Sequence, residues 1–414
     1  MNVLASLFTG AMFMAFLDGG SLRAVIVTLE TVTIGNPGNP NDQDFGSGAF
    51  GSVGSTYAIG KYEVTLNQYT AFLNAIAATD TFGLYDPSQG SDLTVRGIAR
   101  SGVSGSYTYS VIGDGDRPAT YVSWLDAARF TNWLHNGQPT GLQGLNTTER
   151  GAYMLDGFPN EITITRSAGA RYWIPSESEW YKAAYYQPAA LGGDADGYWR
   201  FPTRSNVIPG NIIGGTPNQA NFNYNSVFSV TQSGTYDPTA NYLSTAGAYS
   251  DSASYYGTFD QGGSLEEWTE GITGSRRTVR GGNFIEEYYS LQASVSDFED
   301  PVLATKYIGF RVATVPEPNA VFSLIVAGGL LLTWRIRPAL ERDKTGRALR
   351  LFISVPSANQ CPVHHAHPCC EECARFDVAA SICSPEPPIE RSRDSGTSQT
   401  LRCLDAQDSG ALRF

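Results

Sequence analysis

The chain has 414 residues, of which 42% are hydrophobic and 12% aromatic, so it is long enough to bury a sizeable core. Only 16% of the residues are charged, while Gly occurs 44 times and Tyr 22 times, which favours a loop-rich, largely β or irregular fold over a helical one. The net charge of −12, with no basic stripe interleaved with aromatic residues, argues against nucleic acid as a partner.

Cysteine and histidine are almost confined to the C-terminal part of the chain. The six cysteines are Cys361, Cys369, Cys370, Cys373, Cys383 and Cys403. Three of the four histidines lie there too, which leaves His135 as the single imidazole of residues 1–360. A disulfide, a Cys nucleophile or a multi-His metal site therefore cannot form within residues 1–360.

Residues 1–24 are predicted to be a secretory signal peptide. The segment from Val3 to Leu17 is apolar, as the central region of such a peptide must be, and cleavage is expected near Ala24. No basic residue precedes the apolar segment, because the first one is Arg23. A plain buried strand is the alternative interpretation.

Three helices are predicted in the body of the chain, at residues 65–77, 123–137 and 176–186. The first opens with Thr65 and Gln68 at capping-box spacing, and the third opens with Ser176 and Glu179 at the same spacing. The second begins at Ser123. One apolar face is expected on each of the first two helices, formed by Tyr69, Phe72, Leu73 and Ile76, and by Ala127, Phe130, Thr131 and Leu134.

Strands are predicted wherever short apolar runs lie between turn residues. These runs are residues 25–34, 107–111, 161–166, 278–282 and 309–315. Residues 190–256 are rich in Asn, Gly, Tyr and Ser with weak periodicity, so long ordered loops are expected there. Such loops need more than an apolar core to fix them, and bound Ca²⁺ is a common solution. One domain is expected over residues 25–315.

Residues 257–271 read GTFDQGGSLEEWTEG, in which Asp260 and Glu267 flank a Gly-Gly pair. Two carboxylates around a tight turn are typical of a Ca²⁺ loop, since Ca²⁺ takes several hard oxygen ligands. A structural turn with solvated acids and a catalytic acid pair are the alternatives. Nothing in the sequence sets a substrate groove or the carboxyl separation that an acid pair needs.

The segment VPEPNAVFSLIVAGGLLLTWRIR, at residues 315–337, joins a Pro-Glu-Pro motif to an apolar run that ends in Arg335 and Arg337. This order resembles the PEP-CTERM sorting signal, here assigned to residues 316–337. The resemblance implies export, temporary anchoring through a transmembrane stretch, and cleavage by an exosortase. An ordinary C-terminal anchor is the alternative. Both interpretations place residues 25–315 outside the cytoplasmic membrane, because the basic residues stay on its cytoplasmic side.

Residues 338–414 continue beyond the point where such signals normally end. Their low apolar periodicity predicts disorder. Within them, CPVHHAHPCCEEC at residues 361–373 holds zinc-ligand types at close spacing, but without a second pair at a finger-like distance. Incidental Cys and His in an unstructured tail are the favoured interpretation.

Six segments of the body occur in a characteristic order. They are KYEVTLNQYTAFLNA, RPATYVSWLDAARFTNWL, YWIPSESEWYKAA, GTFDQGGSLEEWTEG, RTVRGGNF and GFRVA. Together they resemble the formylglycine-generating-enzyme (sulfatase-modifying factor) family over about residues 55–315. The resemblance implies an α+β fold, a variant of the C-type-lectin-like fold that is loop-rich, with few helices, short antiparallel strands and structural Ca²⁺.

The resemblance also implies Ca²⁺ ligands. A first ion would be bound by the carboxylates of Asp260 and Glu267 and by the main-chain oxygens of Gly263 and Leu265. A second ion would lie near Asn221, Phe222 and Asp237, on a looser alignment. The family usually has Asn-Val-Trp-Glu-Trp where this chain has Ser-Leu-Glu-Glu-Trp at residues 264–268, but both acidic positions are kept.

Catalysis in the family depends on two Cys that follow the Arg-Gly-Gly motif and bind Cu(I), for which soft thiolates are suited. In RGGNFIEEYYSLQAS, at residues 280–294, the two positions fall on Glu286 and Leu291. Copper is therefore not expected. The iron-dependent branch of the family uses His ligands on an additional domain, which His135 cannot replace. We expect His135 to act instead as a cation or donor near a helix C-terminus.

The sequence leaves two functional hypotheses. The first is an exported, non-catalytic, Ca²⁺-stabilised binding or structural module of the cell envelope or exopolysaccharide. Its partner would be a polysaccharide or an envelope protein, since Tyr and Asn side chains suit sugar recognition, an argument by analogy of fold. The alternative is an oxidase or protein-modifying enzyme with a non-Cys site at Glu286, Glu287 and Arg280. Arg280 is otherwise expected to pair with a buried acid, and Glu286 to be a solvated loop residue.

Overall fold

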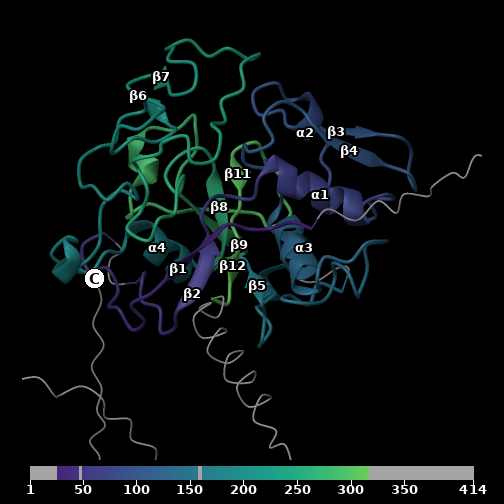
Figure 1. The fold of residues 1–414 in the computed structure, drawn as a ribbon, viewed down its shortest axis with the longest axis horizontal. Coiled ribbons are helices and arrows are strands. Elements are labelled where there is room, and N and C mark those ends of the chain that lie inside the picture. The colour runs from purple at the N-terminus through teal and green to yellow at the C-terminus, as the bar shows by residue number, and fades with distance from the viewer. Residues whose placement is uncertain (1–25, 46–48, 157–160, 317–414) are drawn as a thin grey trace, which may run out of the picture. The chain divides into compact units, whose positions relative to one another are not determined.

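The computed structural model describes residues 26–45, 49–156 and 161–316. They belong to one compact unit, shown in Figure 1. The predicted signal peptide, the tail and all but the first residue of the sorting segment lie outside the described residues. Within the described ranges, no helix is long and apolar enough to cross a membrane.

Two four-stranded sheets form the centre of the unit. The first has the order β1-β2-β12-β5, and all its neighbours are antiparallel. Its strands are β1 (Thr31–Ile34), β2 (Tyr57–Gly60), β12 (Ala313–Thr314) and β5 (Tyr172–Trp173). The sheet thus joins the first and last described strands of the chain.

The second sheet has the order β10-β9-β8-β11. Its strands are β10 (Asp297–Glu299), β9 (Arg276–Arg280), β8 (Glu266–Thr273) and β11 (Ile308–Gly309). The contacts of β9 are antiparallel, whereas β11 runs parallel to β8 and places Gly309 beside Glu267. The second half of the predicted Ca²⁺ loop is therefore the start of a strand.

Three helices form where the sequence predicts them. They are α1 (Leu66–Ile76), α3 (Trp124–His135) and α4 (Glu177–Tyr185). Each begins with a complete capping box, in which the cap side chain and the third helical side chain bond each other's backbone N–H. The short α2 (Ser88–Ser91) was not predicted, because four residues carry no readable period.

The predicted strand at residues 161–166 is wrong. Its described part begins with the 3₁₀ helix η1 (Glu161–Thr163). The carbonyl of Ile164 accepts a hydrogen bond from Arg277 Nη2 at 2.7 Å, and Arg166 bonds Glu179 and Glu270. Hydrogen bonds that involve side chains therefore hold this segment in place of backbone pairing with a neighbouring strand.

Residues 190–256 form long loops, as expected. The regular structure within them is the end of η2 (Ala189–Leu191) and the hairpin of β6 (Asn223–Tyr224) and β7 (Val227–Phe228). Side-chain amides order these loops. Asn211 Nδ2 donates to the carbonyl of Val227 at 2.8 Å, and the Asn211 carbonyl accepts from Ser229 Oγ at 2.6 Å. The remaining elements are the hairpin of β3 (Ile98–Ser101) and β4 (Thr108–Val111), and the 3₁₀ helix η3 (Tyr288–Leu291).

Aromatic side chains hold α1 against α3, which lie together in Figure 1. Phe130 of α3 meets Phe72 of α1 edge-on, with ring centroids 5.2 Å apart, and meets Phe310 edge-on at 5.4 Å. The predicted apolar face of α1 is buried throughout, as is that of α3. The core therefore joins both helices to the chain that links β11 to β12.

Replacing Phe130 by Ala should lower the free energy of unfolding by about 3–5 kcal/mol, because Phe130 is fully buried and its removal leaves a cavity. Urea unfolding followed by tryptophan fluorescence measures the loss. The control is Val103→Ala, since Val103 is 70% exposed and its truncation should leave stability unchanged. Equal losses in the two variants would contradict this account of the core.

Lys182 of α4 is buried, and its Nζ donates to the carbonyl of Asn36 at 2.8 Å. Burial disfavours the charged form and lowers the pKa of Lys182 to about 8. Because the folded state holds this proton less tightly than the unfolded chain, Lys182 costs stability below pH 8. That cost falls as the pH rises from about 8 toward the unfolded value of 10.5.

Lys182→Met should therefore raise the free energy of unfolding near pH 7, by about 1 kcal/mol. The difference between the variant and the parent protein should shrink between pH 8 and pH 10, because the parent loses its buried charge there. Urea unfolding across this pH range measures it. A difference that stays constant with pH would show that the ammonium is not the source of the cost.

Candidate acid cluster and metal loop

The carboxylate of Glu267 forms a bidentate ion pair with Arg311. Arg311 Nε lies 2.5 Å from one carboxylate oxygen and Nη2 lies 2.6 Å from the other, and both side chains are fully buried. Trp180 Nε1 donates to the same carboxylate at 2.9 Å. Glu267 stands at the second position of β8, and Arg311 follows β11, so the parallel pairing of these strands places the two side chains together.

Arg311 also holds main-chain carbonyls from two other segments. Nη1 donates to the carbonyls of Gly60, the last residue of β2, at 3.0 Å and of Lys61, the next residue, at 3.3 Å. Nη2 donates to the carbonyl of Phe259 at 3.0 Å, just before the predicted Ca²⁺ loop. The guanidinium therefore fixes β2, β8 and the loop before β8 relative to one another.

Two further carboxyl groups lie near this pair. Glu63 is 3% exposed, and its Oε1 has no hydrogen-bond partner among the described residues. Burial, reinforced by the charges of Asp260 and Glu267, raises the pKa of Glu63 well above its usual value. Burial likewise raises the pKa of Asp260 to about 6, although Asp260 Oδ2 accepts a hydrogen bond from the backbone N–H of Gly247 at 2.6 Å. Three carboxyl groups thus lie in the neighbourhood of one guanidinium, of which Glu267 alone contacts it, and full ionisation would leave two negative charges uncompensated.

The loop before β8 is tightly curled. Asp260, Gly263 and Ser264 have φ angles of 60°, 80° and 63°, in the left-handed region. Gly263 donates to the carbonyl of Gly281 and Ser264 to that of Asn221, both at 2.8 Å. A Cβ at Gly263 would lie 2.2 Å from the Asn221 oxygen, so glycine is required there.

The loop contains oxygen ligands of the type that a hard divalent cation takes. Two excess negative charges call for two protons or one divalent ion, and Ca²⁺ takes carboxylate and main-chain oxygens. Within residues 26–45, 49–156 and 161–316, no three acidic or imidazole side chains converge on one point. An ion would therefore be held by Asp260 and the carbonyls of Gly263 and Leu265, and would share Glu267 with Arg311.

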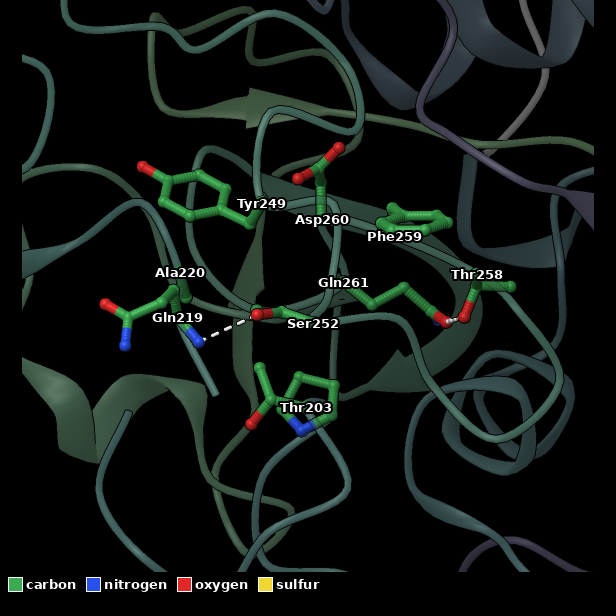
Figure 2. Close-up of a pocket in the computed structure, with 11 residues that line it drawn as sticks. Thr203, Gln219, Ala220, Tyr249, Ser252, Thr258, Phe259, Asp260 and Gln261 are labelled. Atoms are coloured by element: carbon green, nitrogen blue, oxygen red, sulfur yellow. Dashed lines mark hydrogen bonds between the residues drawn. The ribbon is translucent and has the colours of Figure 1, made fainter. Parts of the chain in front are cut away.

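A small cavity of about 10 Å³ lies beside Asp260. Figure 2 shows Asp260 and Tyr249 on the opposite side of it from Thr203, with Ser252 between Gln219 and Gln261. Hydrogen bonds from Gln219 N to Ser252 Oγ at 2.8 Å and from Thr258 Oγ1 to Gln261 at 2.5 Å close its walls. Such a volume accepts a water-sized species but no organic ligand.

The residues predicted for a second ion do not form a comparable site. The Asn221 amide donates to the carbonyl of Tyr242 at 2.9 Å, and the Phe222 carbonyl accepts from Asn211 at 3.3 Å. Asp237 is exposed, and its carboxylate accepts from the backbone N–H and hydroxyl of Thr239. The Asn221 bond uses the amide nitrogen and the Asp237 bonds use one carboxylate oxygen, so a second ion at these residues stays a prediction.

The positions that the resemblance assigns to the two Cys differ in environment. Leu291, at the end of η3, is fully buried against Phe201, Ala220 and Phe222. Glu286 is partly buried, and burial raises the pKa of its carboxyl, so it is less solvated than expected.

Glu286 lies next to a second acid. Asn283 joins the two, donating from its backbone N–H to Glu286 at 3.2 Å and from its amide to Glu266 at 3.5 Å. Burial, then the charges of Glu286 and Asp297, raise the pKa of Glu266 to about 8. Arg280 pairs with Glu177 at 2.7 Å, which confirms that it is the partner of an acid.

His135 ends α3, as predicted, but it accepts a hydrogen bond there and is not the expected cation. Its Nδ1 accepts a hydrogen bond from the backbone N–H of Arg171 at 3.1 Å. Burial, and then the charge of Arg171, lower the pKa of the imidazole. The ring is therefore held in its neutral, accepting form.

The sequence analysis missed Glu63 and Arg311 as members of the cluster. Both lie in segments that carried the family resemblance, in KYEVT and GFRVA. The available signal was a charged residue between apolar neighbours, since Glu63 follows Tyr62 and precedes Val64, while Arg311 stands between Phe310 and Val312. Such a charge needs a buried partner.

Arg311→Met should lower the free energy of unfolding by about 3–5 kcal/mol, because it leaves buried carboxylates without a counter-charge. Glu267→Gln should cost less, since Glu63 and Asp260 remain near the guanidinium. Urea unfolding measures both. Arg150→Met is the control, because the Arg150–Asp156 pair is exposed and its loss should not be measurable. A larger loss of unfolding free energy in Glu267→Gln than in Arg311→Met would contradict the conclusion that carboxyl groups outnumber counter-charges in this cluster.

One family model and several solved structures are similar to this chain. The family model described as "Sulfatase-modifying factor enzyme 1-like domain" matches residues 44–315. No curated protein matches the chain. The solved structure of CarF is similar, with 20% identity, a TM-score of 0.45, and coverage of 70% of this chain and 100% of CarF.

Two further solved structures are similar at lower identity. Treponema denticola variable protein 1 has 16% identity and a TM-score of 0.39, over 71% of this chain and 98% of that protein. PvdO from Pseudomonas aeruginosa has 15% identity and a TM-score of 0.37, over 70% of this chain and 92% of PvdO. Since the family model spans well over half of the sequence and the fold is loop-rich α+β with short, mostly antiparallel strands, the chain belongs to the sulfatase-modifying factor enzyme 1-like domain family.

Proposed function

We propose that the protein is a non-catalytic, Ca²⁺-stabilised binding or structural module of the cell envelope or exopolysaccharide. The observation that carries the proposal is the environment of Leu291. It is fully buried in an apolar cluster, at a position where copper chemistry would need an accessible thiolate. Residues 1–360 contain no Cys to replace it.

Calcium belongs to the proposal because the acid cluster has an excess of negative charge. Asp260 and the curled main chain that follows it offer hard oxygen donors, and a divalent ion would compensate the charge that Arg311 alone leaves over. The ion would join β8 to the loop before it. Its role would be to stabilise the fold, with no reaction attached to it.

The export that we propose for this protein supports a polysaccharide or an envelope protein as its partner. The apolar N-terminal segment and the Pro-Glu-Pro segment at residues 315–337 point to secretion, transient anchoring in the cytoplasmic membrane and exosortase-type processing. Tyr-rich loops would contribute stacking surfaces for sugars. Tyr289 is 56% exposed and Tyr224 is 39% exposed, both on segments near Glu286.

One observation favours the alternative, a protein-modifying enzyme with a non-Cys site. Glu266 has a raised pKa and lies near Glu286, and a carboxyl that titrates near neutral pH can act as a general acid or base. The metal content of the purified full-length chain, measured with no metal added, and its retention on a polysaccharide distinguish the two functions. Calcium without copper or iron, and retention on an insoluble polysaccharide, would support the module. About one equivalent of copper or iron would support the enzyme and contradict the module.

Removing calcium with a chelator should lower the melting temperature, and restoring calcium should reverse the change, because the ion binds the folded state alone. Asp260→Asn should weaken this response, since it removes the carboxylate proposed as a ligand. Asp251→Asn is the matched control and should respond like the parent protein, because Asp251 is exposed and belongs to neither predicted ligand set. A melting temperature that is independent of calcium in all three proteins would refute the proposed ion.

A further inference from the structure

A cavity of about 470 Å³ is lined by residues outside the predicted Ca²⁺ loop and does not include Glu286 or Leu291. Its walls come from the end of β2 and the start of α1, and from residues 28–30, 116, 245–246 and 312. Its volume falls within the range of sites for small molecules, which is roughly 300–1,000 Å³.

The cavity walls are acidic. Three carboxyl residues, Glu30, Glu63 and Asp116, line them, and no Lys, Arg or His is among the lining residues. Lys61 lies close by but is paired with Glu30 at 2.6 Å. Asp116 uses one oxygen to accept a hydrogen bond from Asn67 at 3.0 Å, and its other oxygen accepts none from the described residues. The cavity therefore offers acceptors and negative charge.

The helix N-terminus at this cavity has no donors to offer an anion. Leu66 N donates to the carbonyl of Arg117 and Asn67 N to that of Gly115, both at 2.9 Å. Gln68 N donates to Thr65 Oγ1, and Tyr69 N to the Thr65 carbonyl. All four N–H groups of the first turn are thus engaged, and the usual attraction of a helix start for phosphate or carboxylate is absent.

Glu63 adds an unpartnered group to the wall. Its side chain is 3% exposed, and its Oε1 has no hydrogen-bond partner among the described residues. Buried oxygens without a donor are rare, and they mark places where a donor is missing. The neighbouring Thr28, Thr65 and Thr245 contribute polar positions suited to hydroxyl groups.

We propose that this cavity binds an amino sugar that carries a free ammonium group. The ammonium would pair with Asp116, whose second oxygen accepts no hydrogen bond from the described residues, while the sugar hydroxyls would donate to the remaining acceptors, with the ring beside Tyr62. The inference rests on the proposed function and narrows its ligand to a polysaccharide with unacetylated amino groups. An N-acetylated or anionic sugar lacks the positive charge that the acidic walls select.

The test measures the binding of glucosamine and its oligomers to the full-length chain by saturation-transfer NMR and calorimetry. Glucose and N-acetylglucosamine serve as uncharged comparisons. Asp116→Asn keeps the acceptor for Asn67 and removes the charge, and Glu30→Gln leaves Lys61 uncompensated beside the cavity without disturbing the core. Asp251→Asn is the matched control, because Asp251 is exposed and does not line the cavity. Melting temperatures confirm that every variant is folded.

Glucosamine should bind about tenfold more tightly than either comparison sugar. Asp116→Asn and Glu30→Gln should each weaken its binding several-fold, and Asp251→Asn should leave it unchanged. Equal affinity for glucosamine and glucose, or equal affinity in Asp116→Asn and Asp251→Asn, would overturn the proposal. Retention on a polysaccharide that persists despite such a result would leave the proposed function intact. Glucosamine binding without any polysaccharide retention would retain the site and refute the proposed function.

Discussion

The buried ion pair of Glu267 and Arg311 is the interaction on which the rest of the structure depends. A charge fully removed from water is tolerated only with a partner and with its remaining hydrogen bonds satisfied. Arg311 meets this requirement by donating to Glu267 and to the carbonyls of Gly60, Lys61 and Phe259. The same bonds that satisfy the charge connect segments more than 200 residues apart. A fold with short strands needs such connections, because its ladders are too small to supply them.

Polar side chains take over the role of regular structure elsewhere in the domain. Asn132 illustrates this, since its amide donates to the carbonyls of Thr148 and Tyr153 and its oxygen accepts from Tyr153 N. Arg166 similarly joins Glu179 of α4 to Glu270 of β8. Each contact satisfies backbone or charge that would otherwise be buried without a partner. Loops can therefore be long and still occupy one conformation.

The segment after β9 contains the buried Leu291 and also Glu286, which lies near Glu266 at the start of β8. Leu291 lies in an apolar cluster, and the carboxyl groups of Glu266 and Glu286 have raised pKa values. Neither environment resembles a metal site lined by soft thiolates. Two cavities of the described residues lie elsewhere, beside Asp260 and at the start of α1.

The sequence by itself determined the three main helices and their caps, because capping boxes and 3.6-residue periodicity are local signals. It also determined that residues 190–256 form loops, and it located Asp260, Glu267 and Arg280 as residues of interest. Only the tertiary structure decided that residues 161–163 are a 3₁₀ helix, that His135 accepts a hydrogen bond, and that Glu63 and Arg311 join the acid cluster. Those outcomes depend on partners from distant segments, such as Arg277, Arg171 and Glu267, whose proximity no local pattern encodes.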